Sequence, residues 1–278
     1  MKKAINIWSF PSGTIKDNLT LAKNAGFEGV ELAFTEVGEL TVNSSDKEVL
    51  AIRKVADDLG LKLPSFASGT CWDYRLSDDD PVLRQKAKDM IKRQLETAKL
   101  LGADTILVIP GVVNASFSFP EKKVAYDVVY ERAMEGIHEL KPYAESLQVN
   151  MALENVGSKF LLSPMEMRDF IDKIGSKYVN AYLDIGNTMS VGYPEDWIRV
   201  LGERIKKVHF KDTRIQGGLC VSVDLLAGHV NYPEVIKALG EVGYDDWVTA
   251  EMIPNYKYYP DAIIYNTSYA MDRILRRK

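Results

Sequence analysis

Residues 206–214, KKVHFKDTR, form the stretch from which the fold can be worked out. Val208 and Phe210 alternate with polar neighbours, which indicates a buried strand, and polar side chains gather at its C-terminal end. His209 lies inside this strand, where an imidazole is unusual, and alone it could be a hydrogen-bonded core residue. Three further expected strands also carry an acid where an apolar residue is typical, which favours a shared chemical role. These acids are Glu154, Asp184 and Glu251.

The rest of the chain repeats one pattern, in which a helix is closed by glycine and followed by a strand. The pattern predicts strands over residues 5–10, 29–34, 61–66, 104–109, 149–154, 179–184, 205–210 and 247–252. It predicts helices over residues 14–24, 46–59, 81–101, 121–147, 163–174, 194–201, 231–242 and 261–276. Pro142 falls inside the fourth helix and predicts a kink or break there.

Repeated strand–helix units of this length are typical of a closed parallel barrel or of an open doubly wound sheet. No GxGxxG or P-loop motif follows the first strand, and polar residues gather at several strand ends. Barrel enzymes place their sites at that end of the strands. We therefore expect an α/β fold, a (β/α)8 TIM barrel, with residues 1–278 as a single domain.

Composition excludes several classes of protein. The chain has 35 basic and 39 acidic residues, a net charge of −4, and only a short basic tail, so a nucleic-acid partner is disfavoured. No apolar run approaches the ~18 residues that a membrane-spanning helix needs. Cys71 and Cys220 form no CxxC pair, and no secretory signal opens the chain. We expect a soluble cytoplasmic protein without a membrane partner.

The four unusual side chains are expected to converge, because the ends of neighbouring barrel strands lie side by side on one rim. Three carboxylates and one imidazole form a mostly oxygen site, which favours Mn²⁺ or Mg²⁺, with Co²⁺ or Zn²⁺ as further candidates. A structural alternative is that basic neighbours neutralise the acids as ion pairs. The predicted metal ligands are Glu154, Asp184, His209 and Glu251; the basic neighbours are Lys207, Lys211 and Arg214.

Five further residues are candidates for binding a substrate. Trp8 and Trp72 could wall a sugar, although ordinary packing explains them as well. Asn187 and Lys211 are expected at the mouth of the barrel, and Arg214 is suited to a hydroxyl or phosphate group. A surface salt bridge is the alternative for Arg214.

Five motifs resemble those of the sugar phosphate isomerase/epimerase superfamily, the xylose-isomerase-like TIM barrels that include ketose 3-epimerases and L-ribulose-5-phosphate 3-epimerase. They are LEN at 153–155, KFLLSP at 159–164, YLDIGN at 182–187, VHFKDT at 208–213 and AEM at 250–252. The resemblance implies that the four predicted ligands hold a metal ion and that Glu154 and Glu251 are also the acid/base pair. It further implies a homodimer or homotetramer.

The activity implied is divalent-metal-dependent isomerisation or epimerisation of a ketose or ketose phosphate. It proceeds by proton abstraction next to the carbonyl through a metal-stabilised enediolate. Asn187 stands where the free-ketose 3-epimerases have a histidine, so the substrate stays open. The alternatives are a metal-dependent lyase of the inosose dehydratase type and a non-catalytic sugar-binding relative. A metal-free retaining glycosidase would leave Asp184 and His209 unexplained, and a metal nuclease would need a histidine-richer site.

Overall fold

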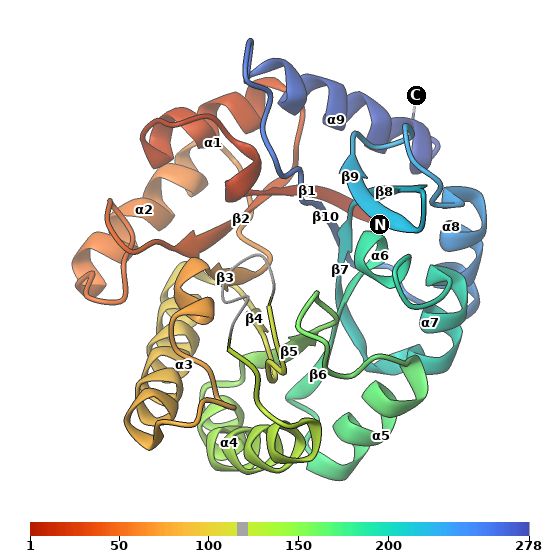
Figure 1. Cartoon of the computed structure of the whole chain (residues 1–278). Coiled ribbons are helices and arrows are strands. Elements are labelled where there is room, and N and C mark those ends of the chain that lie inside the picture. The colour runs from red at the N-terminus through yellow and green to blue at the C-terminus, as the bar shows by residue number, and fades with distance from the viewer. Residues whose placement is uncertain (116–121, 278) are drawn as a thin grey trace.

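The computed structural model describes residues 1–115 and 122–277 as a closed barrel of parallel strands surrounded by helices (Figure 1). The barrel strands are β1 (Lys2–Asn6), β2 (Gly29–Phe34), β3 (Phe66–Ser68), β4 (Thr105–Val108), β5 (Asn150–Glu154), β6 (Val179–Asp184), β7 (Ile205–Phe210) and β10 (Trp247–Ala250). They follow one another around the barrel in chain order, and β1 pairs with β10 to close it. The predicted (β/α)8 TIM barrel is confirmed.

The helices between the strands begin and end at the local signals that the sequence carries. The Ser163 and Asp80 side chains accept hydrogen bonds from backbone N–H groups of the helices that follow them, and Gly102 and Gly175 end two helices with φ of 80° and 66°. Within the described residues, no helix combines the length and apolar character needed to cross a membrane. The helices are α1 (Ile15–Asn24), α2 (Asp46–Asp58), α3 (Pro81–Leu101), α4 (Tyr126–Leu147), α5 (Pro164–Ile174), α6 (Ile185–Thr188), α7 (Pro194–Leu201), α8 (Tyr232–Glu241) and α9 (Ala262–Ile274).

Two predicted strands differ from the structure by more than two residues at one or both ends. The strand predicted over 5–10 ends at Asn6, whose side chain accepts a hydrogen bond from the backbone N–H of Trp8 and starts the short 3₁₀ turn η1 (Ile7–Ser9). The strand predicted over 61–66 is displaced to β3, because Pro64 has no N–H to donate and residue 62 forms only one bridge to β2.

Three helical or hairpin segments also differ from the prediction. The helix predicted to begin near residue 121 begins at Tyr126, and residues 116–121 lie outside the described range. Pro142 does not break α4, which runs on to Leu147. The prediction missed α6 and the antiparallel hairpin of β8 (Asp212–Gln216) and β9 (Leu219–Val223).

The barrel strands are buried on both faces, with a different lining on each. Val30 and Leu32 of β2 belong to the large core between the strands and the helices, whereas Ala33 belongs to the small cluster inside the barrel. Side chains alternate along a strand, so Glu31 shares the interior with Ala33. By the same alternation Tyr182 and Asp184 of β6 lie inside, which brings polar groups into the centre of the barrel.

Candidate metal centre and cavity

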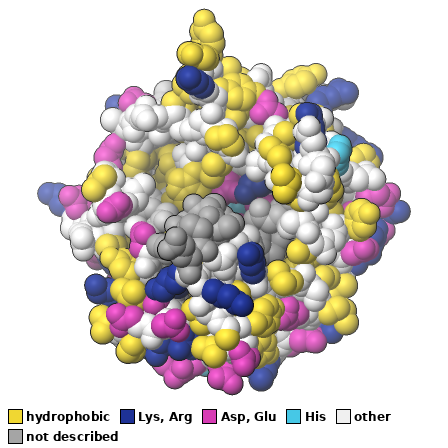
Figure 2. Space-filling model, in the orientation of Figure 1, with side chains coloured by type: hydrophobic (Ala, Val, Ile, Leu, Met, Phe, Trp, Pro, Cys, Tyr) yellow, Lys and Arg dark blue, Asp and Glu magenta, His cyan; other side chains and the backbone are white. Residues whose placement is uncertain are grey.

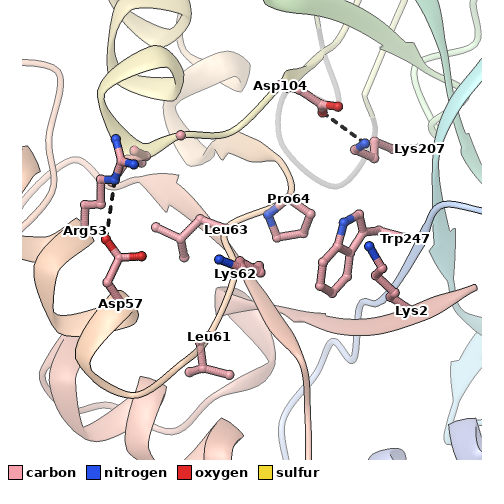
Figure 3. A pocket seen from close by; sticks show the side chains of 12 residues that line it. Lys2, Arg53, Asp57, Leu61, Lys62, Leu63, Pro64, Asp104, Lys207 and Trp247 are labelled. Carbon is pink, nitrogen blue, oxygen red and sulfur yellow. Dashed lines mark ion pairs between the residues drawn. The ribbon is translucent and has the colours of Figure 1, made fainter.

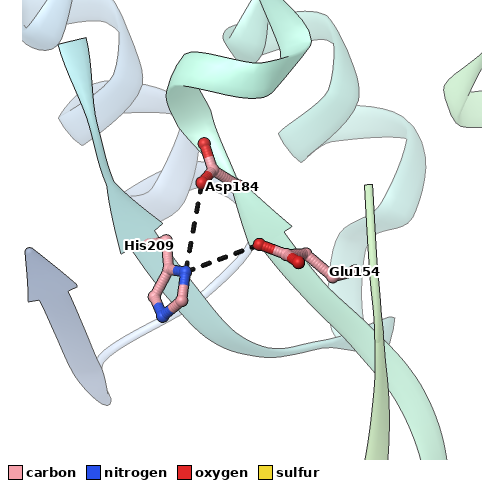
Figure 4. A group of neighbouring side chains, drawn as sticks. All are labelled: Glu154, Asp184 and His209. Carbon is pink, nitrogen blue, oxygen red and sulfur yellow. Dashed lines mark ion pairs between the residues drawn. The ribbon is translucent and has the colours of Figure 1, made fainter. Parts of the chain in front are cut away.

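Three side chains from neighbouring strands meet at the C-terminal end of the barrel (Figure 4). Glu154 ends β5, Asp184 ends β6, and His209 lies opposite Asp184 in the register of β7. All three are buried, and one ligand atom from each lies within 4.8 Å of the other two. Nδ1 of His209 is 3.6 Å from Oε1 of Glu154 and 3.9 Å from Oδ2 of Asp184. The structure therefore brings together three of the four predicted ligands.

Glu251, the fourth predicted ligand, directly follows β10 and is bound to the barrel by its backbone N–H, which donates to the carbonyl of Phe210. Its carboxylate forms an ion pair with Lys211. The Lys211 ammonium also lies 3.2 Å from Oδ2 of Asp184. Lys211 thus connects Glu251 to the cluster. Asp184 and Glu251, two of the predicted ligands, share the ammonium group of Lys211.

The pKa values of the three buried carboxylates are shifted in different directions. Burial, together with the charges of Glu251 and Asp184, raises the pKa of Glu154 to about 7. Burial also raises the pKa of Asp184. Burial opposes ionisation of Glu251 too, but Lys211 and His209 outweigh it and lower the pKa of Glu251. Three carboxylates at such close quarters resist being charged together unless further positive charge is present.

Two buried atoms support a cation as the source of that charge. Nδ1 of His209 and Oδ2 of Asp184 are both buried without a hydrogen bond among the described residues, although Oδ2 forms an ion pair with Lys211 at 3.2 Å. Native proteins rarely leave a buried atom such as this nitrogen without a partner. Both face the same small space as Oε1 of Glu154, and carboxylate oxygens with imidazole nitrogen suit Mn²⁺, Mg²⁺, Co²⁺ or Zn²⁺. The residues present therefore fit a divalent cation.

Sequence reasoning missed one member of this group, Glu31 of β2. Its carboxylate is fully buried, and Oε1 lies 2.8 Å from Nε2 of His209. Burial acts against the charge of Glu31, but His209, Ser65 and Tyr182 outweigh it and lower its pKa. The signal was present in the sequence, since Glu31 is another acid inside an apolar strand, GVELAF at 29–34.

A cavity of about 480 Å³ opens beside the cluster. Figure 2 shows the hollow near the centre of this face, with hydrophobic side chains on one side and acidic and basic side chains together at its floor. Glu154 and Glu251 both line it, as do four of the five predicted substrate-binding residues. Those four are Trp8, Trp72, Asn187 and Lys211. Apolar side chains from neighbouring strand ends and loops complete much of the wall, including Leu107, Ile109, Val156 and Ile253.

Arg214 lies elsewhere. It is on the exposed part of β8, and its guanidinium donates a hydrogen bond of 2.6 Å to the carbonyl of Ala227. It is absent from the described lining of the cavity. Its role in substrate binding stays a prediction, which no described contact supports.

A second hollow, of about 320 Å³, lies at the opposite end of the barrel (Figure 3). Its walls include Lys2 and Trp247, the first residues of β1 and β10. Lys207 pairs there with Asp104 at 2.9 Å, so part of its charge is already matched. Since the cluster and its cavity lie at the C-terminal ends of the strands, where barrel enzymes carry their chemistry, we take that end as the candidate site.

Residues 19–266 match the model of the family described as xylose isomerase-like TIM barrel. The chain belongs to this family. This member of the xylose isomerase-like TIM barrels is similar to proteins named as sugar epimerases. It is 23% identical over 239 residues to the L-ribulose-5-phosphate 3-epimerase UlaE of Escherichia coli strain K12, a match that covers 82% of this chain and 78% of the relative.

Two solved structures share the xylose isomerase-like barrel over nearly the whole chain. A D-psicose 3-epimerase crystallised in the presence of D-fructose has a TM-score of 0.78 and 22% identity, covering 99% of this chain and 97% of the other. The IOLI protein, crystallised with a bound zinc atom, has a TM-score of 0.82 and 18% identity, covering 99% and 98%. At this identity the two structures support the fold.

Proposed function

We propose that this protein is a divalent-metal-dependent epimerase or isomerase of a ketose, acting by proton transfer next to the carbonyl. The observation that carries the proposal is the position of Glu154 and Glu251 in one cavity. Glu154 ends β5 and Glu251 follows β10, and β6 and β7 separate these strands, so the two carboxylates reach the cavity from different sides. The names of the relatives support the same chemistry.

In this proposal Glu154 and Glu251 exchange protons with the substrate. One carboxylate accepts a proton from the carbon beside the ketone, and the other returns a proton, from the opposite face in an epimerase or to the neighbouring carbon in an isomerase. Lys211 holds Glu251 ionised and fixes its position through the ion pair. Trp8 and Trp72 supply the wall against which a sugar ring or chain packs and from which water is excluded.

Glu154, Asp184, His209 and Glu251 would hold the cation, with Mn²⁺ or Mg²⁺ favoured by the carboxylate-rich donor set and zinc suggested by one related structure. When bound, such an ion supplies positive charge that stabilises an enediolate, the charged form a substrate adopts once its proton is removed.

The cavity favours a free ketose over a ketose phosphate, although the UlaE relative is named for a phosphate ester. Lys211 is the one cationic side chain in the described lining, and Asp184 and Glu251 already match its charge. Residues 116–121, outside the described range, contain no Lys or Arg. A phosphate dianion in this lining would lie among carboxylates without a cation of its own, which is costly.

The test is deuterium incorporation from D₂O into a panel of ketoses and their phosphates, with Mn²⁺ and with EDTA. We expect exchange at one carbon, with Mn²⁺ only, and more rapid for a free ketose than for its phosphate. Exchange that survives EDTA would refute the metal dependence. Loss of water from the substrate would replace the proposal by the lyase of the inosose dehydratase type, and binding without exchange would replace it by a sugar-binding relative.

The remaining expectations are part of the same proposal. We propose that residues 1–278 act as one barrel domain in the cytoplasm, as a homodimer or homotetramer, with a small sugar as partner and neither nucleic acid nor membrane.

A further inference from the structure

Glu31 is a buried carboxylate that the proposed proton transfer does not use. It is on β2, across the barrel from the strands that carry Asp184 and His209. It contacts Nε2 of His209, whereas Glu154 and Asp184 lie nearest Nδ1. The two nitrogens are on different sides of the imidazole ring, so Glu31 holds the ring from the side away from the cluster.

The carboxylate of Glu31 is itself held by four groups. Oε1 lies 2.6 Å from Nδ2 of Asn6 as well as beside His209, and Oε2 accepts hydrogen bonds from the hydroxyls of Ser65 and Tyr182 at 2.5 and 2.6 Å. These partners come from β1, from the residue before β3, from β6 and from β7. Both oxygens are therefore occupied, and the group has little freedom to turn toward a metal ion or a substrate.

We infer that Glu31 is a positioning residue of the proposed metal centre: by accepting a hydrogen bond from Nε2–H of His209, it turns Nδ1 toward Glu154 and Asp184. The inference rests on the proposed function, since it concerns the same cation. A histidine that binds metal through one nitrogen needs a partner for the other, and that partner fixes both the tautomer and the ring orientation. Glu31 is in contact with the imidazole and with no atom of the cavity lining among the contacts described.

The first measurement is Mn²⁺ affinity by isothermal titration calorimetry. Glu31→Gln keeps the size of the side chain and removes its charge, and we expect binding about 10–100-fold weaker than in the unchanged protein. Ser65→Ala and Tyr182→Phe each remove one donor to Glu31 while the carboxylate stays, and we expect smaller losses. Asp78→Asn is the matched control, because Asp78 is also a buried carboxylate but pairs with Arg75 and Lys122. It is expected to leave Mn²⁺ affinity unchanged.

The second measurement determines the tautomer of the His209 ring, by ¹⁵N NMR of the imidazole nitrogens with Mg²⁺ or Zn²⁺ bound. The chain has three histidines, so the His209 signals can be assigned by the loss of signal in His209→Asn. We expect the proton on Nε2 in the unchanged protein, and a mixture of tautomers or altered shifts in Glu31→Gln. A residue that merely stabilised the barrel would change the unfolding midpoint and leave the tautomer as it was.

Each outcome decides the inference. Unchanged affinity and unchanged His209 signals in Glu31→Gln would overturn it. If that variant does not fold, the double variant Ser65→Ala/Tyr182→Phe decides in its place by the same two readouts. Absence of Mn²⁺, Mg²⁺ or Zn²⁺ binding in the unchanged protein would overturn the inference and the metal dependence together. Tight metal binding without deuterium exchange into any ketose would overturn the proposed reaction. The affinity and NMR results would still test the role of Glu31.

Discussion

At the scale of single residues, the role of a buried polar side chain depends on the groups that lie next to it. His209 has a carboxylate at each nitrogen, Glu31 at 2.8 Å from Nε2 and Glu154 at 3.6 Å from Nδ1. Burial opposes protonation of His209, but Glu31, Glu154 and Glu251 together outweigh it, and the pKa of His209 is raised well above its usual value. A divalent cation at Nδ1 must therefore displace a proton, which ties metal binding to proton release.

The two carboxylates assigned to proton transfer can be tested separately. Glu154→Gln and Glu251→Gln each remove a proton-transfer group and a charged candidate ligand. We expect each to lower the deuterium exchange rate of the best ketose by about 10²–10⁴-fold, the usual contribution of a positioned acid or base. Glu203→Gln is the control, because Glu203 is exposed beside the N-terminal end of β7 and should leave the rate unchanged. Full activity in both Glu154→Gln and Glu251→Gln would contradict the assignment.

The packing around Lys211 makes a second prediction at this scale. A Cβ added at Gly186 would lie 2.8 Å from Cβ and Cγ of Lys211. We expect Gly186→Ala to displace Lys211 from Asp184 and Glu251, to slow exchange, and to cost about 1–3 kcal/mol in the free energy of unfolding by overpacking. In Gly240→Ala, where an added Cβ meets nothing within 4 Å, urea unfolding should show no such loss. Equal stability of the two variants would argue against the clash.

At the scale of elements, the segment after the β8–β9 hairpin is organised by one carboxylate. Asp212 accepts hydrogen bonds from the backbone N–H groups of Leu226, Gly228 and Val230 at 2.9–3.2 Å. A Cβ at Gly228 would lie 2.1 Å from Oδ1 of Asp212, so the backbone can approach this closely only because residue 228 is glycine. The segment that returns the chain from the hairpin to α8 therefore depends on Asp212.

Removing the charge of Asp212 should loosen that segment. Hydrogen bonds to a charged acceptor contribute about 1.5–3 kcal/mol each. We expect amide hydrogen exchange at residues 226, 228 and 230 to quicken by about 10-fold or more in Asp212→Asn, the factor that about 1.4 kcal/mol gives. Asp224→Asn is the matched control, since the Asp224 side chain contacts Tyr256 instead of these amides. Exchange that quickens equally in both variants would mean that the whole hairpin had been loosened.

The hairpin itself shows where reasoning from the sequence stopped short. Gly217 and Gly218 have φ of 58° and 80°, and Gly-Gly between two alternating runs is a hairpin signal that was present and overlooked. The strand predicted over 61–66 failed for a different reason, because an apolar run shows burial without showing which residues pair. Apart from the single bridge of Lys62 to Gly29, pairing with β2 and β4 starts at Phe66.

At the scale of the whole molecule, a bound cation stabilises the folded protein because the unfolded chain lacks the site. With Mn²⁺ at a hundred times its dissociation constant, we expect about 2.7 kcal/mol of added stability. For a chain of this size that corresponds to a rise of about 5 °C in the midpoint of thermal unfolding. EDTA should reverse the rise, as measured by calorimetry.

Asp184→Asn supplies the control for that shift. Asp184 carries a buried oxygen 3.9 Å from Nδ1 of His209, and the substitution takes away its charge. The midpoint of this variant should respond little to Mn²⁺ at the same concentration. A shift as large as that of the unchanged protein would place the cation elsewhere.

The sequence by itself determined the order of strands and helices, the closed barrel and three side chains of the cluster. It could do so because periodicity and glycine stops are local, and because consecutive strands of a barrel are neighbours. Only the tertiary structure showed that Lys211 pairs with Glu251, that Arg214 donates to the carbonyl of Ala227 and that Glu31 reaches His209 across the barrel. The Glu31 and Lys211 contacts join different strands through side chains, and Arg214 contacts a loop, so chain order does not predict how these groups meet.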